Sequence, residues 1–209
     1  MFNFYSRWSL PRQLSISALI SVVLAISIFL FVVSTVFYKE INKVSDSHQE
    51  KEVSLIVSQL EARFNAIMHM TNTLSAVLND EFKALEVSTD ETVKIGSINS
   101  PRVSLSGETL NLNFKKIDQF TRSTGATATI FVRDGNDFLR ATTSLKKENG
   151  DRAIGTYLGN QHPGYQKLIS GQAYVGKAFL FGKNYMTKYV PVVRSGKTIA
   201  ILYIGVAYD

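Results

Sequence analysis

The sequence predicts an α+β protein in which two consecutive helical segments precede an antiparallel β-sheet. The stretch from Leu14 to Tyr38 contains no charged residue. Between Val53 and Leu78, apolar residues recur every three or four positions, which is the period of an amphipathic helix. From residue 86 onward, β-branched and aromatic runs alternate with Gly, Asn and Asp, as strands alternate with turns.

The uncharged stretch 14–38 reads LSISALISVVLAISIFLFVVSTVFY and is long enough to cross a hydrocarbon core of roughly 30 Å. A signal peptide is the alternative, but its apolar region has about 7–15 residues and ends at a small-x-small cleavage site. Here the apolar run is longer and ends in Val36-Phe37-Tyr38. The sequence therefore predicts a retained transmembrane helix over residues 14–38, with the lipid bilayer as a partner.

Charges on either side of this helix predict its orientation. Arg7 and Arg12 precede it, and no acid comes before Glu40. By the positive-inside rule, residues 1–13 stay in the cytoplasm and the chain beyond the helix crosses the membrane. Trp8 lies where an interfacial aromatic residue is expected. The domain beyond the helix is therefore expected outside the cytoplasm, and the absence of cysteine is compatible with a bacterial inner-membrane protein whose domain lies in the periplasm.

Residues 39–87 are expected to form one long helix outside the membrane, because neither proline nor glycine interrupts them. A helix of this length without stop signals is typical of a coiled coil, or of a helix that leaves the membrane and runs along a domain. His48 and His69 lie on this helix, too far apart to share one metal ion.

Residues 88–209 are expected to form a sheet of five or six antiparallel strands with short helices. The first expected strand is TLNLN, residues 109–113, and an amphipathic helix from Phe114 to Thr124 follows it. Ile117 and Phe120 should face inward on this helix, and Gly125 should end it.

A hairpin is expected next, because Asp134-Gly135-Asn136-Asp137 separates the runs ATATIFVR and FLRATTSL. A loop-rich stretch with a short helix at 164–170 follows. The last three expected strands are AYVGKAFLFG, NYMTKYVPVVR and TIAILYIGVAY.

Composition argues against several classes of function. The chain has no cysteine and three histidines, and its net charge of +6 is scattered rather than clustered, so we expect no nucleic-acid partner. The candidate acid–base carboxylates, Asp134, Asp137, Glu148 and Asp151, stand in turn-like contexts. His162, the one histidine outside the long helix, lies in a loop before Pro163 and shows no triad pattern. The segment GQAYVGK matches a phosphate-binding loop, but Ala178 replaces its Ser or Thr. We expect no enzyme, no cofactor and no metal site.

Polar groups on the expected strands are the remaining signal. Tyr185, Thr187 and Tyr189 alternate with other residues and therefore share one face of a strand. Arg140 shares a face with Phe138 and Thr142 in the same way. A strand arginine is often a solvated edge charge. A buried guanidinium beside these hydroxyls would instead form a small polar pocket for a carboxylate.

These segments resemble a known family: the extracytoplasmic Cache sensor domains of bacterial chemoreceptors, of the single-Cache, Cache 3/Cache 2 fusion type. The resemblance rests on ATIFVRDGNDFLRATTSL, DRAIGTYL, HPGYQKLISGQAYVGKAFLFGKNYMTKYVPV and GKTIAILYIGVAY, and it covers residues from about 40 to 209. It implies a PAS-like fold with the long helix beside the sheet, and a small ligand between the sheet and its covering loops. It also implies a homodimer joined along the long helix.

The citrate-type sensor kinases resemble this fold and bind ligand carboxylates through a strand with Arg-x-x-His. Arg140 and Thr143 match that motif here, so the arginine is kept and the histidine is not. The basic pair of those kinases corresponds to Thr187 and Tyr189. The resemblance therefore favours a monocarboxylate, an amino acid or a similar small polar ligand. The implied ligand-binding residues are Arg140, Tyr185, Thr187, Tyr189, Tyr203, Phe131 and Thr143, with Tyr157, His162 and Tyr165 as lid candidates.

In receptors of this family, a second transmembrane helix, a HAMP linker and a methyl-accepting signalling domain follow the sensor. This chain stops at Asp209, so we expect a fragment or a truncated product. The expected function is a sensor that transmits ligand occupancy through helices to such a module. The alternatives are the sensor of a histidine kinase or diguanylate cyclase, or a structural protein without a ligand. A cavity lined by Arg140, Tyr185 and Tyr189 would favour a sensor over a structural role.

Overall fold

The computed structural model describes residues 9–208, and within them the side chains of all residues except 42–49. The predictions for Arg7, Trp8 and the side chain of His48 lie outside the described residues. The chain divides into two compact units, one ending at Glu61 and the other beginning at Ala62. The second unit carries both sheets.

Helix α1 spans Leu10–Glu81 and contains a segment, Leu10–Ile41, that is long and apolar enough to cross a membrane. This segment includes the predicted span 14–38. The predicted end of the long helix at residue 87 is wrong, because the chain turns at residues 82–84 and enters a strand at Leu85. Burial explains the difference: Phe82 and Leu85 lie in the core, and tertiary packing overrides helix propensity there.

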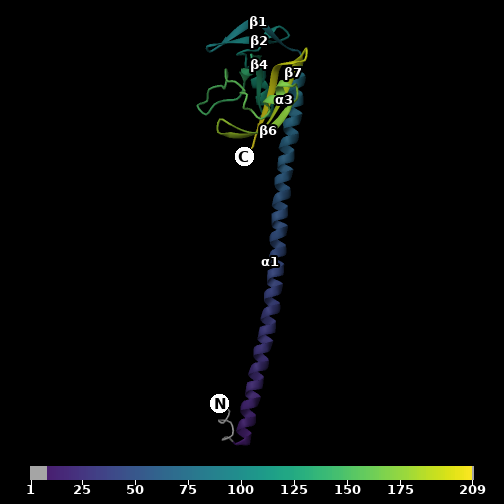
Figure 1. Ribbon diagram of the computed structural model, residues 1–209, viewed down its shortest axis with the longest axis vertical. Helices are drawn as coiled ribbons and strands as arrows, with labels where there is room; N and C mark the ends of the chain where they lie inside the picture. Colours follow the sequence, from purple (N-terminus) through teal and green to yellow (C-terminus); the bar gives the residue numbers. More distant parts are fainter. Residues whose placement is uncertain (1–8, 209) are drawn as a thin grey trace. The chain divides into compact units, whose positions relative to one another are not determined.

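Three strands form a small antiparallel sheet that the sequence reading missed. They are β1 (Leu85–Ile95), β2 (Ile98–Leu105) and β3 (Glu108–Thr109), in the order β1-β2-β3. In Figure 1 this sheet lies beyond one end of β4. Strand β1 has no regular alternation of apolar and polar residues, and most of it is exposed or half-buried. The period-2 signal that predicts strands is therefore absent from it.

The strand predicted at residues 109–113 is also wrong beyond Thr109. The Asn111 side chain takes the place of a neighbouring strand: its Oδ1 accepts a hydrogen bond from the Val103 backbone N at 2.7 Å. Its Nδ2 donates to Ser100 Oγ and to the Pro101 carbonyl, both at 3.0 Å. Leu112 then has a positive φ of 59°. This buried side-chain network ends the strand.

The larger sheet has five antiparallel strands in the order β5-β4-β8-β7-β6. The predicted hairpins and the predicted helices at 114–124 and 164–170 are confirmed to within a few residues. Gly125 ends α2 in the left-handed conformation, as predicted. The bounds are α2 (Lys115–Thr124), β4 (Thr127–Asp134), β5 (Asp137–Thr143), α3 (Tyr165–Ile169), β6 (Tyr174–Leu180), β7 (Lys183–Arg194) and β8 (Lys197–Ala207).

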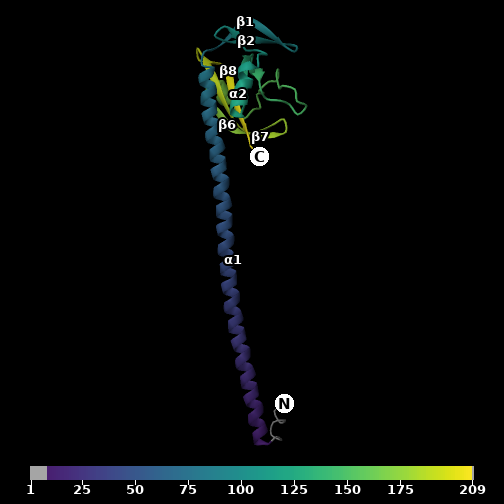
Figure 2. The ribbon, with the colours of Figure 1, turned by 180° about the vertical axis from the view of Figure 1, so that it is seen from behind.

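The two faces of this sheet are covered by different elements. Helix α2 lies over the face seen in Figure 2, where Ile117 and Phe120 join an aliphatic core with Leu78 of α1. Helix α3 and the loop before it cover the opposite face, which Figure 1 shows. We call these the helix face and the loop face. The α+β architecture of a long apolar helix followed by antiparallel sheets is confirmed.

Candidate functional site

A row of hydroxyl side chains crosses the loop face from one edge of the sheet to the other. The strand register pairs Thr143 with Thr129, Thr129 with Tyr203, Tyr203 with Tyr189, and Tyr189 with Tyr174. Directly paired residues point to the same face, so each strand contributes one hydroxyl. We call these five residues the hydroxyl row. The sequence reading included three of them and missed Thr129 and Tyr174.

Strand β7 contributes further hydroxyls to the same face. Tyr185, Thr187 and Tyr189 are all buried, as a strand packed under a loop requires. Thr187 Oγ1 donates to the Gly176 carbonyl of β6 at 2.7 Å. The three side chains therefore share one face of β7, as predicted, and the loop covers that face.

An irregularity in β5 corrects the predicted face of its polar residues. Arg140 pairs with Phe131, but Thr142 pairs with Ile130 and Thr143 with Thr129, so the register shifts between them. Arg140 and Thr143 consequently both point to the loop face. Thr142 points to the helix face, where its Oγ1 donates to the Asn113 carbonyl at 2.8 Å. The bulge re-aims the side chains, which strict alternation cannot anticipate.

The guanidinium of Arg140 lies over the Phe131 ring, with its central carbon 4.8 Å from the ring centroid. Its Nη1 donates to the Ala153 carbonyl at 3.2 Å and to Thr156 Oγ1. Residues 155–158 pair with the free edge of β5, for example through the Gly155 backbone N, which donates to the Arg140 carbonyl at 3.1 Å. This pairing closes the loop over the arginine and excludes water from it.

No acid among the described side chains forms an ion pair with Arg140. Arg140 is 8% exposed. Its Nε has no hydrogen-bond partner. Burial lowers the pKa of Arg140, and the nearby Tyr203 and Tyr189 act in the opposite direction. A guanidinium stays charged in proteins, so the loop face holds an uncompensated cation.

Two tyrosines lie flat along their own strands, each over the glycine two residues further on. A methyl group at Gly205 would collide with the Tyr203 hydroxyl, and one at Gly176 would collide with the Tyr174 hydroxyl. Both glycines are therefore required by the close approach of an aromatic side chain. The repeated pattern Tyr-x-Gly was a sequence signal for these positions, and the sequence reading did not use it.

The Tyr203 hydroxyl is buried without a hydrogen-bond partner. The Thr127 hydroxyl, which lies beside the same Gly205, donates to the Gly205 carbonyl at 3.1 Å. Burial raises the pKa of Tyr203 and raises that of Tyr189 to about 12, although Arg140 opposes the shift at Tyr189. Both phenols remain protonated donors at neutral pH.

The three lid candidates divide into two groups. The His162 ring contacts Tyr189 and Tyr174, with centroids 4.6 and 5.4 Å apart, and Tyr165 packs against Phe138 at 6.5 Å. Both therefore cover the loop face. Tyr157 lies elsewhere: it is 43% exposed, and its hydroxyl donates to Asp134 Oδ2 at 2.6 Å. That hydrogen bond raises the pKa of Tyr157 to about 12 and anchors the loop to the β4–β5 turn.

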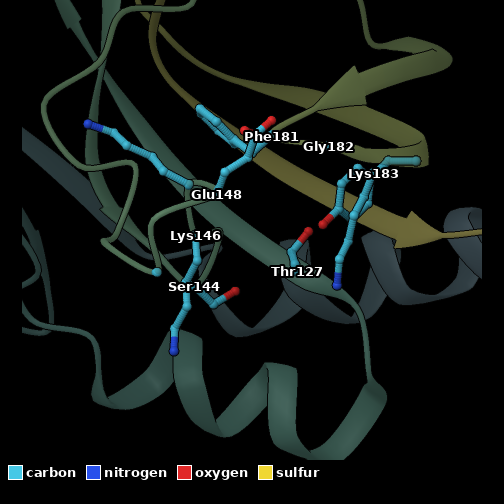
Figure 3. A pocket seen from close by; sticks show the side chains of 10 residues that line it. Thr127, Ser144, Lys146, Glu148, Phe181, Gly182 and Lys183 are labelled. Atoms are coloured by element: carbon cyan, nitrogen blue, oxygen red, sulfur yellow. The ribbon is translucent and has the colours of Figure 1, made fainter.

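A pocket of about 530 Å³ opens at the end of the loop face where β4 begins and β6 turns into β7 (Figure 3). Tyr185 lines this pocket, but Arg140 and Tyr189 do not. This pocket is therefore not the expected cavity lined by all three residues. Arg140 and Tyr189 lie instead among packed aromatic rings. We call the 530 Å³ pocket the lysine pocket, because three lysines line it: Lys146, Lys147 and Lys183. Its lining also includes Thr127, Glu148 and Tyr185.

The arrangement around Arg140 presents hydrogen-bond donors that can bind an anion. An arginine and several protonated hydroxyls are all hydrogen-bond donors, and His162 Nδ1 already accepts a bond from the Gly164 backbone N at 3.1 Å. Within residues 9–208, no group of three or more His, Asp or Glu residues could hold a metal ion.

Comparison with known proteins identifies the family of this domain. The model of the Cache 3/Cache 2 fusion domain matches residues 34–209, which include both sheets. A search of the curated proteins finds none that matches. A Cache domain is an extracytoplasmic sensor domain for signal transduction, and the apolar start of α1 fits a membrane-anchored protein. The chain belongs to the Cache 3/Cache 2 fusion domain family.

Proposed function

We propose that this domain senses a small anionic or zwitterionic molecule that pairs with Arg140. The observation that carries the proposal is a buried guanidinium with an unpaired Nε and no acid beside it. An uncompensated charge in a water-excluded site destabilises the fold, and a bound carboxylate would relieve that cost. The ligand supplies the acid that the chain lacks.

The groups around Arg140 favour a singly charged ligand. Beside Arg140, the loop face offers the hydroxyls of Tyr203 and Tyr189, which are neutral donors. The other arginine of this face, Arg133, lies over the Phe138 ring and already donates to the Gly135 and Thr198 carbonyls at 3.2 and 3.3 Å, so it is engaged by the backbone rather than open to a second carboxylate. A monocarboxylate, an amino acid or a similar small polar molecule fits these donors best.

Strands β6 and β7 connect this face to α1. Lys188 lies between Thr187 and Tyr189 and points to the other side, where its Nζ donates to Asn72 Oδ1 of α1 at 2.9 Å. Lys177 of β6 lies over the Phe64 ring of α1, with Nζ 5.1 Å from the centroid. A ligand that shifts β6 and β7 would thereby shift α1. A coupling of about 1–3 kcal/mol, the usual scale of allostery, is sufficient.

The proposed setting is the bacterial inner membrane. The positive-inside rule supports a cytoplasmic N-terminus and a periplasmic domain. The proposed protein is the sensor of a methyl-accepting chemotaxis receptor, or of a histidine kinase or diguanylate cyclase, with the homodimer joined along α1. It has no catalytic activity and needs no cofactor or nucleic acid.

A purely structural role is the second candidate, and the packing of aromatic rings favours it. The ring centroid of Tyr189 lies 5.0 Å from that of Tyr203 and 4.6 Å from that of His162, so the protein's own side chains fill much of the space beside Arg140. In this alternative the domain binds no ligand and holds α1 in a dimer. A response to ligand that depends on Arg140 separates the two roles.

The test is a thermal-shift screen of the full-length chain in detergent micelles against monocarboxylates, amino acids and amines. A ligand present at a hundred times its dissociation constant should stabilise the fold by about 2.7 kcal/mol. Arg140→Met should abolish the response, and Arg122→Met, which removes an exposed arginine of α2, should keep it. A hit that stabilises Arg140→Met as strongly as the unaltered chain contradicts the proposal.

The same variant makes a prediction without ligand. Met removes the buried charge and leaves the Ala153 carbonyl satisfied, because Thr156 Oγ1 also donates to it at 2.9 Å. Replacing even a paired buried ion together with its partner by apolar side chains is often neutral or stabilising by about 1–4 kcal/mol, and Arg140 has no ion pair to lose. The melting temperature of ligand-free Arg140→Met should therefore equal or exceed that of the unaltered chain. A large decrease would show that Arg140 has a structural role.

A further inference from the structure

The lysine pocket lies apart from Arg140 and carries a larger net positive charge than the single arginine. Thr127, which lines it, precedes the Arg140 partner Phe131 by four residues on β4, about 13 Å along a strand. Three lysines and one glutamate line the pocket, which leaves two net positive charges. None of these four side chains forms an ion pair with any described residue. Like charges without counter-ions repel one another, so an anion would stabilise this region.

Neutral donors stand beside the lysines. In Figure 3 the Lys183 side chain runs down beside the Thr127 hydroxyl, while Glu148 lies across the pocket near Phe181 and Gly182. Tyr185 lines the same pocket, and its ring is buried while its hydroxyl makes no hydrogen bond among the described residues. Burial raises the pKa of Tyr185, so its phenol remains a donor.

The turn that forms one wall of the pocket is strained. Phe181 has φ of 49° and Gly182 has φ of 81°, as the two central residues of a tight hairpin turn require. Asn or Gly usually holds the first of these positions, and a bulky residue there costs on the order of 1 kcal/mol or more. The Phe181 side chain lines the pocket, so the strained residue forms part of its wall.

We propose that the lysine pocket is a second binding site and takes a small dianion, either a dicarboxylate or a phosphate. Lys183 pairs with the anion beside the Thr127 and Tyr185 hydroxyls, and Lys146 and Lys147 add positive potential. A volume of about 530 Å³ accommodates such a molecule with its nearest waters. The site does not depend on the sensing of a ligand at Arg140, because the two sets of binding residues do not overlap.

Isothermal titration calorimetry of the full-length chain in micelles tests this proposal. Succinate, inorganic phosphate and acetate are titrated at constant ionic strength, because exposed charges are screened by salt. At least one of the two dianions should bind at one site per chain, and acetate should bind more weakly. The proposal is overturned if neither dianion shows saturable binding with a dissociation constant below about 1 mM. It is also overturned if acetate binds as tightly as the dianions.

Charge variants locate the site. Lys183→Gln should weaken dianion binding about fivefold, the effect of one charge pair near 4 Å in water, and Lys146→Gln/Lys147→Gln should also weaken it. Lys197→Gln, which removes an exposed lysine outside the pocket, should leave binding unchanged. If Lys197→Gln weakens binding equally, the anion is attracted by the basic chain in general and the proposal fails.

Glu148→Gln tests whether the net positive charge of the pocket attracts the ligand. Removing the one acid of the pocket should tighten dianion binding about fivefold by the same arithmetic. Weaker binding of succinate and phosphate by Glu148→Gln would mean that the charge of the pocket does not govern binding, and this would overturn the dianion assignment. Arg140→Met should leave dianion binding unchanged, so a failure here is distinguishable from a failure of the proposed sensing site.

Discussion

The two faces of the five-stranded sheet are both buried, but different chemistry fills them. On the helix face, Ile130, Val132, Leu202 and Ile204 form an aliphatic core in which the described side chains leave no buried polar atom unpaired. The loop face holds aromatic rings, a row of hydroxyls and a buried arginine. The two unpaired buried atoms of the described chain, Arg140 Nε and the Tyr203 hydroxyl, both belong to the loop face.

This difference separates stability from function. Aliphatic burial contributes roughly 25 cal/mol per Å² and needs no partner. Buried polar groups without partners lower stability, and natural proteins retain such violations mainly at functional sites. The helix face therefore holds the domain together, while the loop face bears the cost of the proposed binding site. Variants on the two faces should show that asymmetry.

The largest effect is expected on the helix face. Ile130→Ala removes a fully buried side chain from the aliphatic core and should lower the free energy of unfolding by about 2–5 kcal/mol. Urea denaturation followed by the near-ultraviolet circular dichroism of the tyrosines measures it. Thr129→Val is the matched variant, since it changes the adjacent loop-face residue with little change in volume.

Thr129→Val should cost only about 1 kcal/mol. The hydroxyl that it removes pairs with Thr143 Oγ1 at 2.6 Å, and that oxygen keeps a second bond from the Leu145 backbone N at 3.0 Å. The proposed separation of stability from function fails if Thr129→Val destabilises the domain as much as Ile130→Ala.

A smaller effect is expected where Tyr203 crosses Gly205. Gly205→Ala forces the hydroxyl away from its place and should cost about 1–3 kcal/mol through overpacking. Tyr203→Phe removes an unpaired buried hydroxyl and should be neutral or stabilising. In the double variant, Phe should recover part of the loss, because its ring lacks the oxygen that collides. Additive effects in this double-mutant cycle would contradict the close approach.

Local sequence signals predicted most of the sheet but not its irregular parts. The alternation in β7 and the Asp-Gly turn are local, and the structure matches both. Strand β1 lacks alternation because little of it is buried, and the stretch after Thr109 is ended by the long-range bonds of Asn111. Such contacts depend on residues distant in the chain, which periodicity does not report.

The site shows the same limit. Placing Tyr185, Thr187 and Tyr189 on one face needed only strand geometry. The position of Thr143 beside Arg140 needed a bulge, which one sequence does not reveal. The exposed position of Tyr157 depends on its bond to Asp134, and the lysine pocket joins three separate segments of the chain.

A pH-dependent effect is expected from the lid. Burial lowers the pKa of His162 below its ordinary value of about 6.5, so the unfolded chain binds this proton more readily than the folded one. The contribution of His162 to the unfolding free energy therefore increases as pH rises from the folded-state pKa to about 6.5. This contribution is lost progressively as pH falls below 6.5. His162→Gln should reduce this dependence, measured as the urea midpoint between about pH 7.5 and pH 5.5.

His69, which is exposed on α1, provides the control for this measurement. His69→Gln should retain the pH dependence of the unaltered chain. An equally steep dependence in His162→Gln would mean that other groups cause it and that the lid is not sensitive to pH.

The smallest effect on stability, and the one that connects the two faces, is expected at Lys188. This residue stands between two loop-face residues and bonds to Asn72 of α1 on the other side. An exposed bond of this kind contributes about 0.5 kcal/mol, so Lys188→Met should scarcely change the urea midpoint. Hydrogen exchange of the α1 amides around Asn72 should nevertheless become faster, because α1 loses a tether to β7. Lys197→Met lacks such a partner and should leave that exchange unchanged. If Lys188→Met also leaves it unchanged, β7 does not hold α1 through this bond, and the route from the loop face to the helix must run through the aliphatic core instead.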